Sequence, residues 1–324
     1  MLEIFSEFYN SVLVDFTNSK KRVYWGYLLA ALVIAVVWLV QTKRVSFAKA
    51  ISIIFSAKVW WSQSAKADYL IFLINKFSFL FIAPLLLTHI TVSQWLFFKC
   101  YEWWGYQSVG NDWPLWTITA LFTFSYFILN DFSRFFVHKL LHEVPFLWEF
   151  HKVHHSARVL TPITVFRTHP VEGILFSFRS IFVQGFLIAV FTFLFGDRVD
   201  LFMFYGVVVT TFLFNLLGSN LRHSQIAIGY WDGVERWLIS PAQHQIHHST
   251  LPKHFDKNYG VILAVWDRWT GTLVYSERDQ ELEFGISRKV EANEQNVLYL
   301  YFQPFKSLFS RLRQISKPKV ANDN

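Results

Sequence analysis

The segment NDFSRFFVHKLLHEVPFLWEFHKVHH, residues 130–155, contains two closely spaced histidine motifs. The first is HxxxH, formed by His138 and His142, and the second is HxxHH, formed by His151, His154 and His155. Residues at positions i, i+3 and i+4 of a helix share one face, so each motif directs its imidazoles the same way. Neutral imidazole is a common nitrogen ligand of zinc, iron and copper. The segment therefore predicts helices that present histidines to a metal site.

A second HxxHH motif, HQIHH, lies farther along the chain, and a single histidine stands between the two in NLRHS. Two HxxHH motifs in a chain with 12 histidines are expected by chance in roughly one chain in ten thousand. Two metal ions with four or five ligands each need about as many donors as these motifs supply. We therefore predict a two-metal centre whose ligands are His138, His142, His151, His154, His155, His223, His244, His247 and His248.

Other polar residues near the motifs have several candidate roles. His169 in RTHPVEG is a candidate tenth ligand, a partner of a ligand, or a residue that begins a helix before Pro170. Glu172, His254 and Asn258 are expected to surround the ligands, where a carboxylate can orient a ligating imidazole through its other ring nitrogen. The single cysteine, Cys100, excludes an intramolecular disulfide and a cysteine-rich zinc site.

The chain is too apolar for an ordinary soluble domain. Hydrophobic residues make up 53% of it and charged residues 16%, and the mean hydropathy is +0.29. The fold class we predict is an all-α polytopic membrane protein with four to five transmembrane helices and a cytosolic helical cap. The expected spans are residues 23–40, a part of 77–98, 113–136, 173–195 and 199–217.

One membrane-embedded unit is expected over residues 1–324, because apolar and histidine-rich segments alternate along the chain. It divides into an N-terminal segment (1–22), a transmembrane scaffold (23–129), a catalytic region (130–277) and a C-terminal tail (278–324). Residues 317–324 are expected to be disordered.

The topology follows from the requirement that all ligands of one centre lie on one side of the membrane. A helical hairpin of 173–195 and 199–217 would return the chain to the side where the first motifs lie. The basic stretch 41–76 lies on that side too, and Lys and Arg mark the cytoplasmic side, so we predict a cytoplasmic metal site. The basic run Lys20, Lys21 and Arg22 disagrees, since this scheme places it on the opposite side.

The order of the motifs resembles that of the fatty acid hydroxylase superfamily, also called the sterol desaturase family. The resemblance covers roughly residues 130–277. It includes the histidine motifs, HPVEG from His169, NLRH ending at His223, NYG from Asn258 and WDRWTGT from Trp266. Some members carry a further histidine about four residues before the position of His223, where this chain has Ser219. That departure makes His169 or a water the candidate for the tenth ligand.

This resemblance implies two iron ions with O2 as co-substrate, and hydroxylation or desaturation of a membrane lipid such as a sterol, an acyl lipid or a lipid headgroup. It also implies a redox partner, such as a ferredoxin- or cytochrome b5-like donor with its reductase. An acidic donor or lipid headgroups could dock on Lys139, Lys152, Arg222, Arg236, Lys253 and Lys257, although positive-inside topology alone explains such residues. No basic surface pattern indicates a nucleic acid.

Two other functions stay open from the residues alone. One is a zinc-dependent membrane hydrolase, although a catalytic zinc ion usually needs only three protein ligands. The other is a non-enzymatic protein that binds metal or haem, although paired haem ligands do not require HxxHH triplets.

Overall fold

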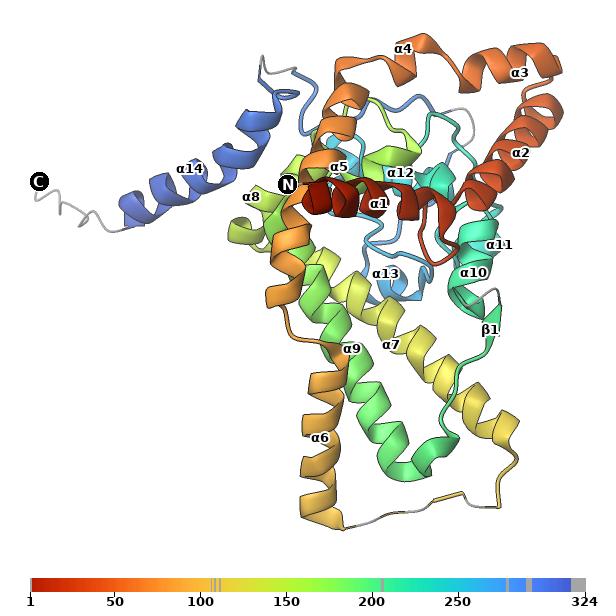
Figure 1. The fold of residues 1–324 in the computed structure, drawn as a ribbon. Coiled ribbons are helices and arrows are strands. Elements are labelled where there is room, and N and C mark those ends of the chain that lie inside the picture. Colours follow the sequence, from red (N-terminus) through yellow and green to blue (C-terminus); the bar gives the residue numbers. More distant parts are fainter. Residues whose placement is uncertain are drawn as a thin grey trace, which may run out of the picture.

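The computed structural model describes residues 2–105, 107, 109–110, 112–204, 207–277, 280–289 and 293–315, and this part of the chain is mostly helical. Figure 1 shows helices of very different length around a broad body and a narrower stalk. The α-helices are α1 (Leu2–Thr17), α2 (Trp25–Thr42), α3 (Phe47–Ile54), α4 (Ala57–Trp60), α5 (Gln63–Ile82), α6 (His89–Trp104), α7 (Leu115–Glu143), α8 (Pro145–His155), α9 (Pro170–Phe195), α10 (Val209–Leu216), α11 (Asp232–Glu235), α12 (Pro241–His247), α13 (Val265–Thr270) and α14 (Val297–Ile315). The 3-10 turns are η1 (Ala83–Leu85), η2 (Pro162–Phe166), η3 (Gly196–Arg198), η4 (Ser219–Arg222) and η5 (Pro252–His254), and strands β1 (Met203–Phe204) and β2 (Val207–Val208) form a small antiparallel pair.

The stalk consists of α6, α7 and α9, which run side by side and project from the body (Figure 1). A small residue permits the close contact between α6 and α9. A Cβ atom on Gly185 would lie 2.8 Å from Val92 Cβ and 3.0 Å from the His89 carbonyl oxygen. The tryptophans Trp103, Trp104, Trp113 and Trp116 are exposed near the far end of the stalk, as is typical where helices meet a membrane–water interface.

Three helical segments are long and apolar enough to cross a membrane: Trp25–Thr42, Gln63–Trp104 and Pro170–Arg198. They confirm the apolar stretches predicted at 23–40 and 173–195 and contain the stretch 77–98. The second segment is interrupted at η1, where Pro84 lacks the amide hydrogen of a continuing helix. The stretch 113–136 is helical within α7, but α7 is not one of the three segments. The chain is an integral membrane protein.

The predicted span at 199–217 is wrong. That stretch contains β1, β2 and the eight-residue helix α10, and eight residues of helix are only about 12 Å long. The β-branched residues Val207 and Val208 favour extended backbone and form β2, directly before α10 begins. The chain therefore returns from the end of α9 as an extended segment alongside α7, where the Phe202 amide donates to Thr123 Oγ1 at 3.0 Å. An extended chain covers about twice the distance of a helix per residue, so a short segment suffices.

Three helices around the histidine groups begin at clear sequence signals. Pro145, Pro170 and Pro241 occupy the first turns of α8, α9 and α12, where the missing amide hydrogen has no helical partner to lose. A capping box between Ser240 and Gln243 also fixes the start of α12. These signals fix the residues at which the helices begin.

The basic run at residues 20–22 lies beside the body, not at the far end of the stalk. Arg22 Nη2 donates to the Ser219 carbonyl at 2.7 Å, and Lys21 lies 3.8 Å from the Asp15 carboxylate. The metal motifs and this run are therefore on the same side of the stalk, contrary to the topology expected from a helical hairpin at 173–217.

The C-terminal helix α14 was not anticipated from the sequence. It carries one exposed apolar row, and it projects from the body in Figure 1. The row consists of Leu298, Phe302, Phe305, Phe309 and Leu312. The prediction of disorder for 317–324 falls on residues outside those that the structure describes.

Candidate metal centre

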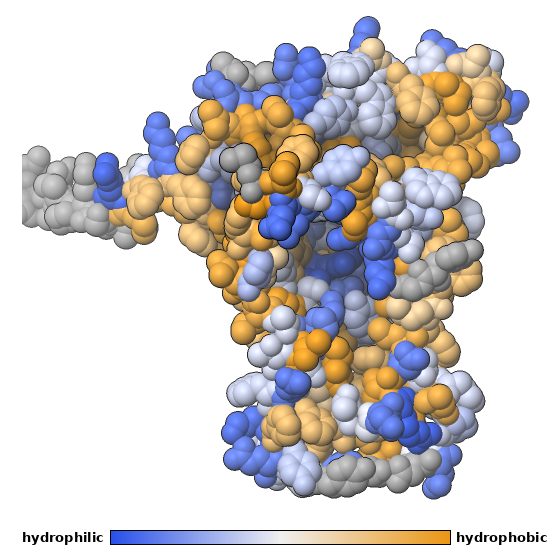
Figure 2. All heavy atoms as spheres, viewed as in Figure 1, coloured by the Kyte–Doolittle hydropathy of each residue, from blue (hydrophilic) through white to orange (hydrophobic). Residues whose placement is uncertain are grey.

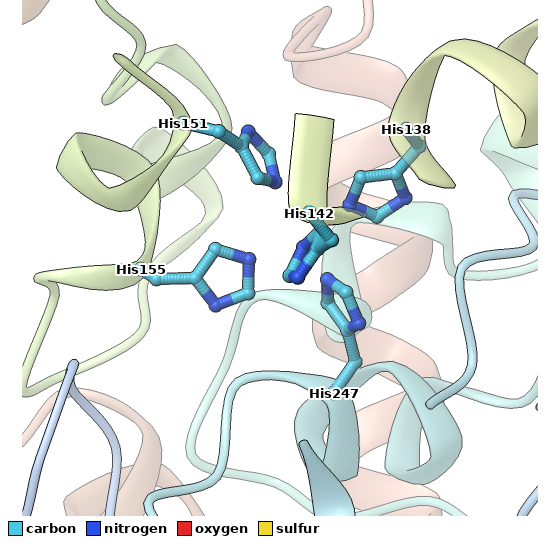
Figure 3. Close-up of side chains that lie close together, drawn as sticks. All are labelled: His138, His142, His151, His155 and His247. Atoms are coloured by element: carbon cyan, nitrogen blue, oxygen red, sulfur yellow. The ribbon is translucent and has the colours of Figure 1, made fainter. Parts of the chain in front are cut away.

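All nine histidines of the predicted ligand set meet in two adjoining groups inside the body. The first group contains five residues and the second contains four. Within each group, one ring nitrogen from every histidine lies within 4.8 Å of those of all the others. Figure 3 shows the five rings of the first group directed toward a common centre. The first group is His138, His142, His151, His155 and His247, and the second is His154, His223, His244 and His248.

The two HxxHH motifs serve the groups in reciprocal ways. On α8 the i,i+4 pair His151 and His155 faces the first group, while His154 faces the second. On α12 and its C-cap the i,i+4 pair His244 and His248 faces the second group, while His247 faces the first. Each motif thus bridges the two groups, and the rings of His155 and His248 stack with centroids 4.5 Å apart. This arrangement holds the groups next to each other.

Backbone carbonyls orient several of the rings. The Nδ1 atom of His138 lies 2.7 Å from the Tyr259 carbonyl, that of His247 lies 2.7 Å from the Lys257 carbonyl, and that of His154 lies 3.2 Å from the Arg167 carbonyl. A neutral imidazole that donates from Nδ1 keeps the Nε2 lone pair free for a metal. The three contacts therefore select the tautomer in which Nε2 is the ligand.

Glu172 lies next to His151. Its Oε1 atom lies 3.0 Å from His151 Nδ1, and both side chains are 3% exposed. The contact does not have the geometry of a hydrogen bond, because His151 Nδ1 has no hydrogen-bond partner among the described residues. Glu172 therefore neighbours a predicted ligand, and a role in orienting its ring stays a prediction.

Two buried aspartates hold the loop that supplies the carbonyl acceptors. Asp267 accepts from the amides of Tyr259 and Gly260 at 2.9 and 2.7 Å, and Asp131 accepts from the amides of Ile262 and Leu263. A Cβ atom on Gly260 would meet Asp267 Oδ2 at 2.8 Å, so glycine is required there. The loop from 257 to 263 is therefore a rigid backing for His138 and His247.

Asn258 stabilises the same loop from within. Its side chain donates to the carbonyls of Gln243 and Val274 at 3.0 Å each and accepts from the Val274 amide at 2.7 Å. It also has a positive φ of 56°, a conformation that asparagine tolerates better than most residues. Asn258 thus supports the two carbonyls on either side of it without facing the centre.

A buried ion pair holds the other side. The guanidinium of Arg167 donates to Asp68 Oδ1 at 2.9 Å, and both side chains are fully buried. Arg167 also bonds the Val153 carbonyl and Ser156 Oγ, both at 3.1 Å through Nε. Removal of one partner would leave an uncompensated buried charge. The pair therefore fixes the Arg167 carbonyl that contacts His154.

Burial keeps the histidines uncharged. It lowers the pKa of His151 and of His154 to about 3. The pKa values of His155, His223, His244, His247 and His248 are also lowered well below the ordinary value, first by burial and then by neighbouring charged groups. The imidazoles are therefore neutral at physiological pH, which is the form that binds metal.

The residues present fit a pair of metal ions. The Nε2 atoms of His142, His151, His155, His247 and His248 are buried and have no hydrogen-bond partner. Buried polar atoms are normally satisfied, so this many unsatisfied lone pairs at one place indicate a bound group. The donors are all imidazole nitrogens, which suit zinc, iron or copper and leave no carboxylate to bridge the ions.

His169 and His254 lie outside both groups. His169 begins α9: its Nδ1 accepts from the Val171 amide at 3.2 Å, and its Nε2 lies 3.1 Å from the Tyr301 carbonyl. His254 lies 3.5 Å from Gln280 at its Nε2 atom. Ser219 does not supply a substitute ligand, because its hydroxyl donates to Asn215 Oδ1 at 3.0 Å. The second group therefore has four histidines.

The sequence-based prediction also misplaced one charged residue and missed three others. Arg222 was considered a docking residue at the surface, but it is 3% exposed and its Nη2 lies 2.8 Å from His244 Nδ1. Arg167, Asp131 and Asp267 were not recognised as supports. A charged residue inside or beside an apolar segment was the only available signal for them.

Comparisons with known proteins agree with this geometry. Residues 123–272 match the model of the fatty acid hydroxylase family. This segment forms a fatty acid hydroxylase domain. The domain contains every histidine of both groups as well as Glu172, Arg167 and Asp267. Helices α1, α2, α5 and α14 lie outside it in sequence.

Several curated proteins are similar to parts of this chain. Human alkylglycerol monooxygenase is 26% identical over 216 residues, which cover 66% of this chain and 41% of that protein. A Delta(7)-sterol 5(6)-desaturase of Gibberella zeae is 30% identical over 157 residues (48% and 43%), and ornithine lipid hydroxylase of Rhizobium tropici is 29% identical over 163 residues (50% and 45%). The chain spans less than half the length of each of these relatives. No solved structure matches the chain significantly.

Proposed function

We propose that this chain is an O2-dependent oxidoreductase that hydroxylates or desaturates a membrane lipid at a histidine-ligated di-iron centre. The observation that carries the proposal is the pair of adjoining groups of buried, neutral imidazoles with unsatisfied Nε2 atoms. The names of the similar proteins, which are lipid monooxygenases, hydroxylases and desaturases, support the same chemistry.

Two iron ions bound here would activate O2 for attack on a C–H bond that no protein side chain can oxidise. The residues of the chain do the rest. The carbonyls of Tyr259, Lys257 and Arg167 hold ring orientations. Burial excludes water, which would otherwise compete for an oxidant. The first group offers five imidazoles and the second four, so the second group leaves more room for O2 or substrate.

An apolar cavity beside the second group suits a lipid chain. It has a volume of about 240 Å³, and Phe127, Leu213, Phe214 and Ile262 are among its lining residues. Arg222, which contacts His244, lines the same cavity. A substrate chain that enters from the spans would therefore reach the edge of the centre without crossing water.

The proposal includes a cytoplasmic centre and a protein electron donor. The basic run 20–22 lies next to the body, where Arg22 bonds the Ser219 carbonyl, and this proximity to the metal groups supports a cytoplasmic position. A ferredoxin- or cytochrome b5-like donor with its reductase would supply electrons. The exposed Arg236 is a candidate contact, whereas Lys139, Lys152 and Lys253 already pair with Glu143, Glu149 and Glu277.

Metal analysis of protein purified without oxygen separates this proposal from its rivals. Roughly two iron ions per chain are expected. Zinc together with hydrolytic activity would instead indicate the hydrolase, and a Soret band after addition of haem would indicate a haem protein.

Lipid analysis then tests the reaction. A deletion strain is compared with strains that carry the wild-type chain or His154→Ala. A lipid that gains the mass of one oxygen atom only with the wild-type chain supports hydroxylation, and loss of two hydrogen atoms supports desaturation. No difference in any lipid would contradict the proposal.

A further inference from the structure

Four arginines form a series of neighbours that begins at the second histidine group, where Arg222 contacts His244. They come from four separate segments: Arg22 follows α1, Arg134 lies on α7, Arg179 lies on α9 and Arg222 ends η4. Arg22 is close enough to Arg134 and Arg222 for the charges to repel, and Arg179 is in the same relation to Arg134. We call these four residues the arginine cluster.

Within the part of the chain that the structure describes, no carboxylate forms an ion pair with a member of this cluster. The guanidiniums bond neutral groups instead. Arg22 donates to the Ser219 carbonyl at 2.7 Å, Arg179 donates to Ser133 Oγ at 2.7 Å and Asn130 Oδ1 at 3.0 Å, and Arg222 donates to the Gly260 carbonyl at 3.0 Å. The Nε atoms of Arg22, Arg179 and Arg222 are buried without a partner.

The nearest carboxylates do not neutralise the cluster. Asp131 and Asp267 act on Arg222 electrostatically, but both are bonded to backbone amides. Burial and the neighbouring positive charges lower the pKa of Arg22 to about 9. The all-imidazole centre next to the cluster adds no negative ligand. Arg222 is buried and the other three arginines are half-buried. Desolvated charge without a counterion is costly, so this excess of positive charge is expected to have an anionic partner.

One cavity is lined by a member of the cluster. Arg222 and Ser219, the acceptor of Arg22, line the apolar cavity of about 240 Å³. A second cavity of about 500 Å³ is lined by residues of α6, α7, α9 and the β1–β2 segment and by Lys20, but by none of the four arginines. Figure 2 shows a recessed hydrophilic area flanked by hydrophobic surface where the stalk meets the body. An amphiphile could therefore place a charged end and an apolar chain at this one location.

We propose that the arginine cluster binds the anionic headgroup, a phosphate or a carboxylate, of the lipid that this centre oxidises. The inference rests on the proposed function and names its substrate class as acidic lipids. Arginine forks suit both anions, because paired N–H groups match their oxygen spacing. Arg222 Nη2 lies 2.8 Å from His244 Nδ1. A headgroup bound by Arg222 would therefore be separated from the metal site by little more than the imidazole ring of His244. The oxidised carbon is thus close to the headgroup, not at the end of the chain.

Binding of soluble short-chain lipids to the purified protein tests this proposal without any turnover. The probes are dioctanoyl phosphatidylglycerol, which is anionic, dioctanoyl glycerol, which is neutral, and inorganic phosphate. Affinities are measured by native mass spectrometry or by the shift in thermal unfolding. We expect the anionic lipid to bind at least about tenfold more tightly than the neutral lipid, because charge-assisted hydrogen bonds are lost with the latter.

The variants Arg22→Gln and Arg179→Gln should each weaken binding of the anionic lipid about tenfold while leaving the neutral lipid unchanged. Arg22→Lys, which keeps the charge, should retain much of the preference. Arg236→Gln, at an exposed arginine of the cap, is the matched control and should bind as the wild type does. Metal content and the unfolding temperature of each variant show whether it has folded.

Equal affinity for the anionic and neutral lipids would overturn the proposal, as would a preference that survives both glutamine variants. Binding of inorganic phosphate as tight as that of the anionic lipid would show a site for free anions, and would overturn the lipid headgroup as its occupant. Because none of these readouts involves O2 or electron transfer, failure of the oxidase proposal would leave the binding result intact, and the two can be judged separately.

Discussion

The histidine centre and the arginine cluster adjoin each other but are built in different ways. Eight of the nine histidines come from three short motifs, and helix spacing already directs each motif to one face. The four arginines come from four segments that are far apart in sequence, with one residue from each. Local repetition therefore reveals the first site, whereas nothing in the sequence near any one arginine reveals the second.

The two sites also differ in how their polar atoms are satisfied. Three histidines have their Nδ1 atoms held by backbone carbonyls, whereas the Nε2 atoms of five histidines have no partner. Three of the four arginines bond neutral groups with some nitrogens and leave Nε without a partner. The comparison teaches that unsatisfied lone pairs mark a site for a cation, whereas unsatisfied donors mark a site for an anion.

The largest effect on bound iron and on turnover is expected from the loss of a predicted ligand in the histidine centre. His247→Ala should remove bound iron and reduce turnover by more than about 100-fold, because loss of a direct ligand exceeds the usual effect of an outer residue. His254→Ala is the matched control, since His254 is as buried but lies outside both groups. Metal analysis and product formation are measured together. Equal iron content in the two variants would show that the first group is not a metal site.

A smaller effect on iron affinity is expected from Asp267, which supports the loop from 257 to 263. Asp267→Asn should weaken the bonds to the Tyr259 and Gly260 amides and reduce iron affinity about tenfold or more. Competition with a chelator measures this change. Asp232→Asn, at an exposed aspartate, should leave the affinity as it is. If both variants kept wild-type affinity, the loop would not be what orients His138.

Acidification should lower the stability of the folded, metal-free protein, because the buried histidines stay neutral in it. The folded-state pKa of His151 and of His154 is about 3, below the value of about 6.5 for an unfolded histidine. The unfolded chain therefore takes up protons first, and stability falls as pH drops from about 6.5 toward 3. Burial raises the pKa of Asp267, which acts in the opposite sense, but the histidines outnumber it. Thermal unfolding of metal-free protein should show a lower midpoint at pH 5 than at pH 7.5. A midpoint of unfolding that is higher at pH 5 than at pH 7.5 would contradict the conclusion that the histidines are buried in their neutral form.

The smallest effect on the metal is expected at His169. His169→Ala removes the cap of α9 and the contact with the Tyr301 carbonyl, which should lower the free energy of unfolding by about 1 kcal/mol. Iron content should equal that of the wild type, because the ring lies outside both groups. Loss of one iron ion in this variant would restore His169 as the tenth ligand.

Much of the centre could be predicted from the sequence, because its histidines recur at helical spacing. The division into five and four could not, since the reciprocal use of the two HxxHH motifs depends on how α8 and α12 pack. The apolar stretches at 23–40 and 173–195 were also predictable from composition. The stretch 199–217 was misread because apolar, β-branched residues suit a membrane helix and a strand equally well in a window of that length.

Residue spacing and hydropathy by themselves thus determined that this chain is a helical membrane protein with a cluster of histidines suited to bind metal. Tertiary structure alone decided which histidines share a group, that Arg222 is buried against His244, and that Lys257 and Tyr259 supply the carbonyls behind the rings. The reason is physical. Helix periodicity is a property of neighbouring residues, whereas hydrogen-bond satisfaction and charge balance depend on segments that meet only after the chain has folded.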